Sequence, residues 1–292
     1  MMYENSTAPP LPRNWPGMPE SAKMRLRPWR RRLTQLIDTQ HMANNSIDVS
    51  EEAGVRYLHF SQDWIQGAMR IQRPNALELA YTREMMAGLL LRDAPWPRNA
   101  LLIGLGAGSL AKFIYHKLPA TQIDVVEIDP QVEIVARLHF KLPDDPRRLR
   151  IIIDDGAEYM LRGDSTYDCI LIDGFDKHGR PGPLDTLPFY QACRARLSDS
   201  GMLAVNLLSR RRGFAASKER IASAFEGRAL VFPSCESGNT IAFARGNEPV
   251  NASLDELTER AETLRRSTGL NLLPTLPRLH SAGKLQGTQL VF

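Results

Sequence analysis

The sequence predicts an α/β protein in which helices cover a mostly parallel β-sheet, with a small antiparallel β unit in front of it. Three observations support this prediction. Short apolar strands alternate with helical segments between about residues 98 and 247, a glycine-rich turn follows the first strand, and shorter alternating strands come before. A chain of 292 residues has room for one full α/β domain with smaller appendages.

The net positive charge of the chain is concentrated in its first 32 residues. This segment holds seven of the 37 Lys and Arg residues, two of the 33 acidic residues and six prolines, which leaves the rest nearly neutral. Such a composition predicts a flexible basic leader over residues 1–32. Because the body lacks a basic patch, a helix-turn-helix signature and an aromatic platform, we do not expect nucleic-acid binding.

Membrane, export and metal signals are absent from the sequence. It has no run of about 18 apolar residues and no signal-peptide pattern, so we expect a cytoplasmic protein that does not span a membrane. Cys169, Cys193 and Cys235 lie far apart, without a CxxC motif or a nearby histidine. Neither a disulfide framework nor a metal site is therefore expected.

The segments before the main series of strands predict a small β unit over residues 33–73. Within it, residues 47–50 and 55–60 alternate in polarity around a turn that contains a glycine. Apolar residues then recur at helical spacing over residues 75–91, which predicts a helix that enters the main domain.

The main domain is expected over residues 74–250. We predict strands at residues 100–103, 123–128, 149–153, 169–172 and 201–208, with helices at 109–117, 131–139, 157–162 and 188–197. Residues 228–232 and 240–244 surround a Ser-Gly-Asn turn, which predicts a final antiparallel hairpin. A parallel series ending in such a hairpin is the layout of the S-adenosylmethionine-dependent transferase (Rossmann-like) fold. Residues 251–292 are expected to form a C-terminal helix and a tail.

The turn after the first strand carries Gly104, Gly106 and Gly108. Glycines allow a sharp turn and a close approach of the backbone to a ligand, and the following helix offers free N–H groups. A tight βα turn alone could also use them. The GxGxG spacing has no third glycine at the dinucleotide position and no basic residue for a pyrophosphate, so an S-adenosyl compound is favoured over NAD.

Acidic residues end the next two strands. Glu127 lies about twenty residues after the glycines, where a carboxylate can accept hydrogen bonds from both ribose hydroxyls. Asp129, just before a proline, is interpreted as the cap of the next helix. Asp155 and Gly156 follow the third strand, where an acceptor can meet an adenine amino group. Together these residues predict a nucleoside site.

Five blocks of sequence, in order and spacing, resemble the spermidine synthase (polyamine aminopropyltransferase) family over about residues 40–245. They are LLIGLGAGSL, DVVEIDP, IIIDDGAEYM, YDCILIDGFD and PFYQACRARL. The GLGxGSLAKF and DGFD runs match the bacterial spermidine synthase-like branch. The resemblance implies transfer of an aminopropyl group from decarboxylated S-adenosylmethionine to a diamine or polyamine. It also implies a homodimer, with an S-adenosyl co-substrate and no permanently bound cofactor.

The resemblance also implies roles for single residues. Asp173 matches the catalytic aspartate, Tyr81 lies near the active-site tyrosine, and Asp176 matches the carboxylate that binds the amine substrate. Gln66 matches a glutamine that contacts the S-adenosyl ligand, and Asn45 replaces another glutamine there. A protonated amine, with a pKa of about 10.4, must lose its proton before it attacks, and Asp173 could accept it. Alternatively, Asp173 could only cap the turn that follows it.

One position in the glycine turn departs from the family. The main branch has an aspartate that faces the amino group of decarboxylated S-adenosylmethionine, and this chain has Ala107 instead. Two other functions therefore stay open, namely an S-adenosylmethionine-dependent methyltransferase and a nucleoside-binding homologue without catalysis. Against the methyltransferase, Leu102 stands where common methyltransferases carry an acid, and no NPPY-like motif is present.

Overall fold

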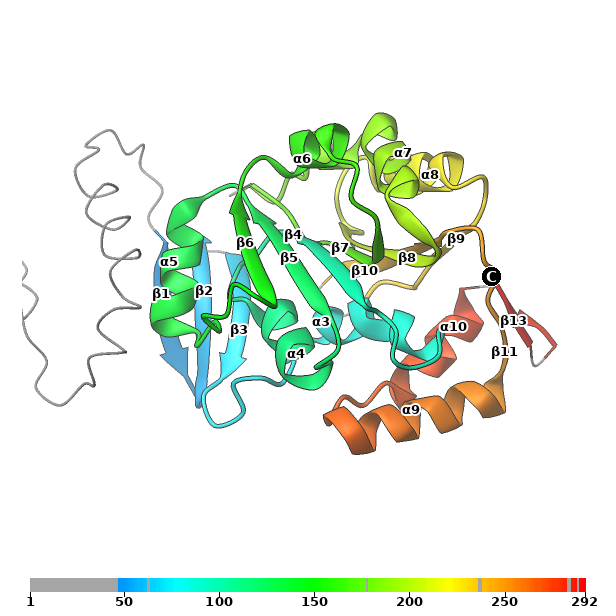
Figure 1. The fold of residues 1–292 in the computed structure, drawn as a ribbon, viewed down its shortest axis with the longest axis horizontal. Helices are drawn as coiled ribbons and strands as arrows, with labels where there is room; N and C mark the ends of the chain where they lie inside the picture. The colour runs from blue at the N-terminus through cyan, green and yellow to red at the C-terminus, as the bar shows by residue number, and fades with distance from the viewer. Residues whose placement is uncertain (1–46, 62–63, 177, 236–237, 283–284, 288) are drawn as a thin grey trace, which may run out of the picture. The chain divides into compact units, whose positions relative to one another are not determined.

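A computed structural model describes residues 47–292 apart from 62–63, 177, 236–237, 283–284 and 288 (Figure 1). Contacts divide the chain into Met1–Asn45 and Ser46–Phe292, and only the second unit is described here. The predicted basic leader and the candidate ligand residue Asn45 lie outside the described residues.

The predicted N-terminal antiparallel unit is confirmed as a three-stranded sheet. Its strands are β1 (Asp48–Glu52), β2 (Val55–Ser61) and β3 (Trp64–Arg70), in that order across the sheet. Glu52 pairs with Val55 across a tight turn, and Gly54 in that turn has the positive φ of 75° that favours glycine.

The main sheet has seven strands in the order β6-β5-β4-β7-β8-β10-β9. The first five are parallel, while β10 runs antiparallel to both β8 and β9, as the predicted hairpin requires. This confirms the predicted α/β fold. The strands are β4 (Asn99–Ile103), β5 (Gln122–Glu127), β6 (Leu149–Ile153), β7 (Tyr167–Ile172), β8 (Leu197–Leu208), β9 (Ala229–Val231) and β10 (Asn239–Arg245).

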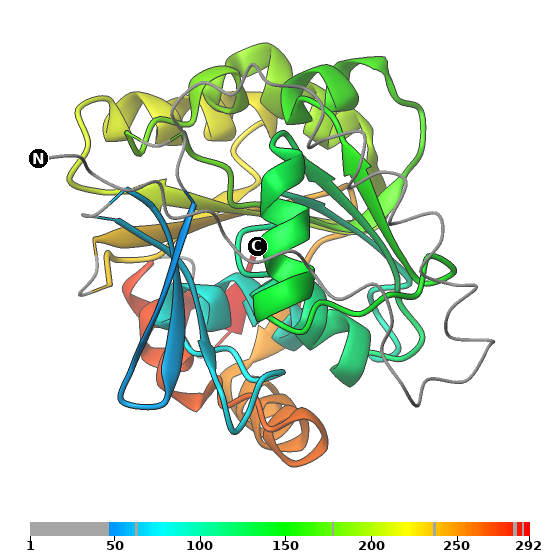
Figure 2. The same ribbon diagram turned by 90° about the vertical axis from the view of Figure 1, so that its left-hand side faces the viewer.

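Helices cover both faces of this sheet (Figures 1 and 2). Figure 1 shows α6, α7 and α8 along one face, with α4 and the C-terminal helices on the other. Each face buries its own apolar cluster, which includes Phe189 and Ile221 on the α7–α8 side and Phe113 and Leu257 on the other. The helices are α4 (Ser109–Lys117), α5 (Pro130–His139), α6 (Gly156–Arg162), α7 (Leu187–Ala195) and α8 (Phe214–Ala224), with the short 3-10 helix η2 (Gly182–Asp185).

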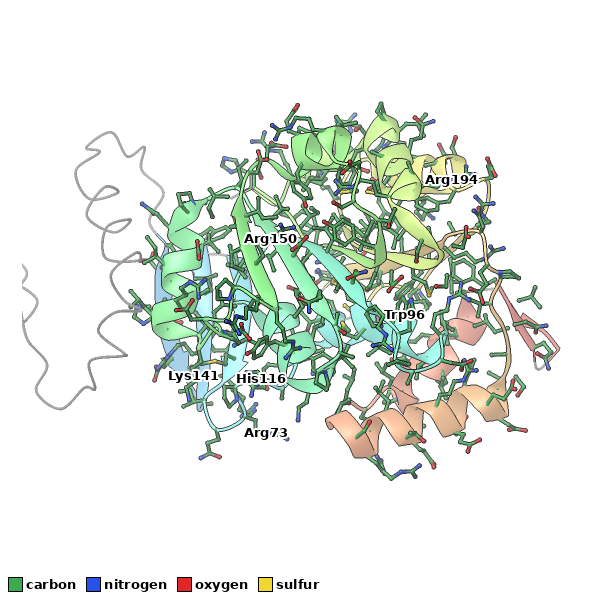
Figure 3. All side chains as sticks on the ribbon, viewed as in Figure 1. Arg73, Trp96, His116, Lys141, Arg150 and Arg194 are labelled. Carbon is green, nitrogen blue, oxygen red and sulfur yellow. The ribbon has the colours of Figure 1, made fainter. Side chains whose placement is uncertain are left out.

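The helix predicted over residues 75–91 is shorter in the structure. It comprises α3 (Ala80–Met85), which continues as the 3-10 helix η1 (Met86–Leu90). Leu77 is buried although it precedes the helix, so its apolar character reflects burial in a loop. Near the other end, Gly88 lies against Trp96, which Figure 3 labels, and a Cβ at Gly88 would be 3.3 Å from the ring.

The C-terminal residues have more structure than the sequence pattern indicates. The predicted helix is α9 (Leu254–Thr268), which begins with a capping box formed by Ser253 and Glu256. It is followed by η3 (Leu273–Thr275), α10 (Leu276–Ser281) and a small sheet of β11 (Asn251–Ser253), β13 (Gln289–Val291) and β12 (Leu285–Gln286). These strands have two or three residues each, too few to show a periodicity. Among the described residues, no helix is long and apolar enough to cross a membrane.

The strand order places the β4 and β7 loops side by side. The chain adds β5 and β6 on one side of β4, then returns to add β7 and β8 on the other side. Ligands of open α/β sheets bind at the carboxyl ends of strands where the order reverses in this way. The glycine turn after β4 and Asp173 after β7 both lie at this point, and the Asp173 N–H donates to the Ile103 carbonyl at 2.9 Å.

Strand β3 of the N-terminal sheet packs on the glycine turn. A Cβ added to Gly67 would lie 2.5 Å from the Ala107 Cβ, and the Ser109 hydroxyl donates to the Ala68 carbonyl at 3.1 Å. Ala107 is buried in a small cluster with Leu58 and Met69 from the same sheet. The N-terminal sheet therefore supports the turn from behind.

This contact predicts that Gly67→Ala lowers the free energy of unfolding by about 1–3 kcal/mol, because the added methyl group overpacks the contact. Chemical denaturation measures the change. The double variant Gly67→Ala/Ala107→Gly has one methyl group at this contact, as the wild type does, and should recover part of the lost free energy of unfolding. A single Gly67→Ala change that costs nothing would show that the two backbones are further apart than described.

Candidate nucleoside and amine site

The glycine turn adopts a backbone that other residues would strain. Gly104, Gly106 and Gly108 have φ values of 97°, 50° and 66°. A Cβ at Gly104 would lie 2.3 Å from the Asp173 carbonyl oxygen, and one at Gly106 would lie 3.1 Å from the Gln66 carbonyl oxygen. The turn is thus held closely between the β7 loop and β3, and the backbone of Gln66 borders it.

Glu127 is a buried carboxylate that organises the loop ends of β4 and β5. It accepts hydrogen bonds from the backbone N–H of Leu105 at 2.8 Å and of Asp129 at 3.0 Å. Burial raises the pKa of Glu127, while these backbone donors oppose the rise. Asp129 caps α5 by accepting from the Gln131 N–H, as the sequence indicates. Glu127 therefore ties the ends of two adjacent strands to the glycine turn.

Asp155 and Gly156 begin α6 at the end of β6. One Asp155 oxygen, Oδ1, caps the helix by accepting from the N–H groups of Ala157 at 2.8 Å and Glu158 at 3.0 Å. Within the described residues, Oδ2 has no hydrogen-bond partner and could accept from a ligand. A Cβ at Gly156 would lie 2.4 Å from the Ile103 side chain and 3.3 Å from that of Leu184, so a glycine is required there for packing.

Two large apolar side chains are exposed beside these acids. Ile128, directly after Glu127, is 67% exposed, and Ile153, at the end of β6, is 40% exposed. Both lie at the carboxyl ends of parallel strands, Ile128 just after β5 and Ile153 as the last residue of β6. An apolar side chain at each of these ends suits the flat face of a base.

Asp173, at the end of β7, is held by two donors from different parts of the chain. The Tyr81 hydroxyl of α3 donates to Oδ2 at 3.1 Å, and the Asn206 amide of β8 donates to Oδ1 at 2.8 Å. The Asn239 amide of β10 in turn donates to the Asn206 oxygen at 2.9 Å. This chain of bonds fixes Asn206 so that its N–H₂ group faces the acid.

The surroundings of Asp173 make it a stronger base than an exposed aspartate. Burial raises the pKa of its carboxyl group, and the hydrogen bonds from Asn206 and Tyr81 oppose this rise. Burial, with the adjacent Asp173 charge, raises the pKa of Tyr81 well above its usual value, so its hydroxyl stays protonated and donates. A carboxylate with a raised pKa is suited to accept a proton near neutral pH.

The structure places Asp176 in a different setting from Asp173. Its Oδ1 accepts from the backbone N–H groups of His178 and Arg180, and its Oδ2 pairs with the Arg180 guanidinium at 2.8 Å. Although burial acts to raise the pKa of Asp176, these contacts lower it overall. Asp176 is exposed, and its charge is compensated within its own loop.

Asn206 and Asn239 are polar residues of the site that the sequence analysis did not select. Asn206 is 5% exposed and lies in the otherwise apolar run of β8. A single amide inside such a run is a signal that could have been noticed, because a buried amide needs partners. Over the described part of the chain, no group of three or more His, Cys, Asp or Glu residues is arranged to hold a metal ion.

Comparisons with known proteins identify relatives over most of the chain. The family model for the spermine/spermidine synthase domain matches residues 78–209. A polyamine aminopropyltransferase of Neisseria meningitidis serogroup B is 37% identical over 241 residues, which cover 82% of this chain and 91% of that protein. The polyamine aminopropyltransferase of Chromobacterium violaceum is 35% identical over 254 residues, which cover 87% and 95%.

Solved structures share the fold. A probable spermidine synthase from Corynebacterium glutamicum matches with a TM-score of 0.62 at 20% identity, over 77% of this chain and 91% of that one. Human methyltransferase-like protein 13 in complex with SAH matches with a TM-score of 0.57 at 26% identity, over 65% and 93%. A spermidine synthase in complex with the transition-state analogue AdoDATO has a TM-score of 0.55 at 23% identity, over 76% and 79%.

The contact between Asn206 and Asp173 predicts a pH-dependent loss of stability in Asn206→Asp. The Asn206 amide lies 2.8 Å from Asp173 Oδ1, so a carboxylate at position 206 would adjoin that of Asp173 in a largely desolvated place. The two acids cannot both ionise there, and the pKa of the pair in the folded state rises above its unfolded value. Stability is then lost as the pH rises from 5 to 8, by roughly 3 kcal/mol. Denaturation at several pH values measures this, and Asn271→Asp on the exposed surface is the matched control. If Asn206→Asp and Asn271→Asp lost the same stability at every pH, the contact between Asn206 and Asp173 would be contradicted.

Proposed function

This chain belongs to the spermine/spermidine synthase family, and we propose that it transfers an aminopropyl group from decarboxylated S-adenosylmethionine to a diamine or polyamine. It is a transferase of polyamine biosynthesis, since relatives that match it over more than four fifths of its length are polyamine aminopropyltransferases. An S-adenosyl compound serves as co-substrate.

The observation that carries the proposal is the position of Asp173. Its backbone lies directly against Gly104 of the glycine turn, and its carboxylate is oriented by Tyr81 and Asn206. A base next to a nucleoside loop is what this transfer needs, because the attacking amine must meet the carbon beside the sulfonium. A nucleoside-binding protein without catalysis would have no use for a desolvated, doubly oriented acid at this place.

We assign the nucleoside to the carboxyl ends of β4, β5 and β6. Glu127 would accept the ribose hydroxyls while it holds the turn, and Oδ2 of Asp155 would accept from the adenine amino group. Ile128 and Ile153 supply exposed apolar surface for the base. The glycine turn would approach the sugar and the sulfonium side of the donor, with Gln66 beside it.

The proposed reaction is a direct displacement. An acceptor amine arrives as an ammonium ion, which the ionised Asp173 attracts and orients. Once the proton has passed to Asp173 or onward to solvent, the nitrogen lone pair attacks the methylene carbon beside sulfur. A C–N bond forms as the C–S bond breaks, and its electron pair stays on sulfur. The products are methylthioadenosine and the amine extended by one aminopropyl group.

Two further positions, Asp176 and Ala107, bear on which substrates fit. Arg180 neutralises Asp176, so we assign the main attraction of the acceptor to Asp173 and keep Asp176 as a weaker second contact. In the glycine turn, Ala107 is buried against Gly67, so its side chain lies away from any ligand over the turn. The amino group of the donor must therefore be held by other groups than in the main branch of the family.

A homodimer remains a prediction from the family resemblance, and a cytoplasmic location remains a prediction from the sequence pattern. In this chain the N-terminal sheet that would pair carries Ile65, which is 51% exposed on β3. Sedimentation or light scattering of the full chain would decide the oligomeric state.

The first prediction from this proposal concerns Asp173→Asn. The amide keeps the shape and removes the base, so turnover of putrescine with decarboxylated S-adenosylmethionine should fall at least about a hundredfold. Mass spectrometry of the products measures the rate. Asp176→Asn is the matched control, with an expected loss of about tenfold or less because Arg180 already compensates its charge. Unchanged turnover in Asp173→Asn, or a methylated product from S-adenosylmethionine, would contradict the proposal.

The second prediction concerns pH and Glu127. Burial raises the pKa of Glu127 above the usual value of 4.5, and a ribose hydroxyl donates best to the ionised form. Affinity for methylthioadenosine should therefore rise as the pH rises through the pKa of Glu127 and then level off. In the free protein, stability falls over the same range because ionisation of a buried group is unfavourable.

Calorimetry between pH 5 and 8 tests this second prediction. Glu127→Gln should bind roughly tenfold more weakly near neutral pH, without the rise at low pH. Glu158→Gln makes the same change on the exposed side of α6 and should leave the binding curve as it is. Equal binding by the wild-type protein and Glu127→Gln would rule out Glu127 as the ribose acceptor.

A further inference from the structure

The C-terminal extension, defined as residues 251–292, packs against the helix that carries Tyr81. Leu276 and Leu279 of α10 are buried in the same apolar cluster as Met85 of α3 and Phe232, which follows β9. Figures 1 and 2 show α10 on the side of the sheet where α3 lies, away from α6, α7 and α8. The extension is thus part of the core around the site.

One polar residue of this extension, Arg278, reaches two segments of the main domain. Its guanidinium forms an ion pair with Glu84 of α3, including a hydrogen bond from Nη2 to Oε2 at 3.2 Å. The same nitrogen donates to the Pro233 carbonyl, just before the turn that leads into β10. Glu84 is 8% exposed, so this pair is largely removed from water.

Both segments that Arg278 joins lead to Asp173. Glu84 lies one helical turn after Tyr81, whose hydroxyl holds Oδ2 of the acid. Pro233 lies two residues before Cys235, whose backbone N–H donates to the Asn239 carbonyl at 2.8 Å. Asn239 orients Asn206, which holds Oδ1. One cation therefore connects the supports on the two sides of the carboxylate.

We propose that Arg278 is a positioning residue for transfer: by bridging Glu84 and Pro233 it keeps Tyr81 and Asn206 aligned on Asp173. The inference rests on the proposed role of Asp173 as base. Arg278 touches neither the acid nor a substrate in this arrangement, so it acts through α3 and the turn before β10.

The chemistry of the pair explains why an arginine is suited to this task. The planar guanidinium can donate to a carboxylate and a carbonyl at once with fixed angles, which a lysine cannot reproduce. Burial raises the pKa of Glu84, and Arg278 opposes that rise. Arg278 therefore helps to keep the Glu84 carboxylate ionised. Removal of Arg278 would leave the buried Glu84 carboxylate without its ion-pair partner and with only the weaker attraction of Arg83, a cost that α3 could relieve by moving Glu84 toward water.

A second arginine of the extension provides the matched control. Arg260 of α9 donates to the Leu90 carbonyl at 3.1 Å and pairs with Asp93 at 2.8 Å. It binds the segment that follows the same helix, nine to twelve residues beyond Tyr81, and among the described residues it has no contact with the turn before β10. A merely structural role for the extension would make the two arginines equivalent.

The experiment compares Arg278→Met with Arg260→Met in the full chain, at a temperature at which both remain folded. We expect Arg278→Met to lower kcat about tenfold or more with the KM for the donor changed less than about threefold. Arg260→Met should leave kcat within about twofold, whatever its Tm. Equal kcat values for the two variants, or losses that follow Tm alone, would overturn the inference.

The pH profile gives a readout that a structural role would not move. The hydrogen bonds from Asn206 and Tyr81 hold the pKa of Asp173 down, so their misalignment should move the acid limb of kcat/KM to higher pH in Arg278→Met. Arg278→Lys, which keeps the charge near Glu84, should recover part of kcat and of the profile. An acid limb unchanged from wild type would count against positioning.

Failure of the inference is separable from failure of the proposed function. If Asp173→Asn loses turnover while Arg278→Met does not, Asp173 stays the base and Arg278 is not its positioning residue. If Asp173→Asn keeps full turnover, the proposed function fails first, and the inference fails with it.

Discussion

The arrangement of this protein depends on a desolvated carboxylate, Asp173, that stays ionisable because two donors hold it. The partly buried acid would otherwise favour its neutral form, and the bonds from Tyr81 and Asn206 limit that cost. These donors come from α3 and β8, so the acid couples segments 92 and 33 residues away from it. The strand reversal at β4 then brings the glycine turn against the same residue, which joins the proposed nucleoside side of the site to the proposed amine side.

The small N-terminal sheet and the C-terminal extension support the site from outside the main sheet. The first lies behind the glycine turn, where Gly67 and Ala107 are in contact and leave no room for a carboxylate. The second lies behind α3, where Arg278 neutralises Glu84. Packing holds the glycine turn at the first place, and an ion pair holds α3, which carries Tyr81, at the second. Ala107, where the resemblance would place an aspartate, therefore packs against the N-terminal sheet and helps to hold the turn.

Much of the fold could be predicted because its elements follow from residues that are close together in the sequence. Strand β4, the glycine turn and α4 are adjacent, and Glu127 ends the next strand, so periodicity and spacing locate them. Tyr81 could be placed only by the family resemblance, since nothing near it in sequence refers to Asp173. Arg278 and Glu84 are 194 residues apart, and no local pattern connects them. The sequence analysis missed β11, β12 and β13 because each is only two or three residues long. In addition, β11 pairs with β13 across a long separation, from Asn251 to Val291.

The most direct test of the account is a crystal structure of the protein with methylthioadenosine and putrescine bound. We expect a putrescine nitrogen within hydrogen-bond distance of an Asp173 oxygen, pointing at the 5′ sulfur of the nucleoside. We also expect both ribose hydroxyls on Glu127 and the base beside Ile128. An amine bound away from Asp173, or a nucleoside whose sulfur faces another group, would contradict the central claim that Asp173 and the glycine turn form one transfer site.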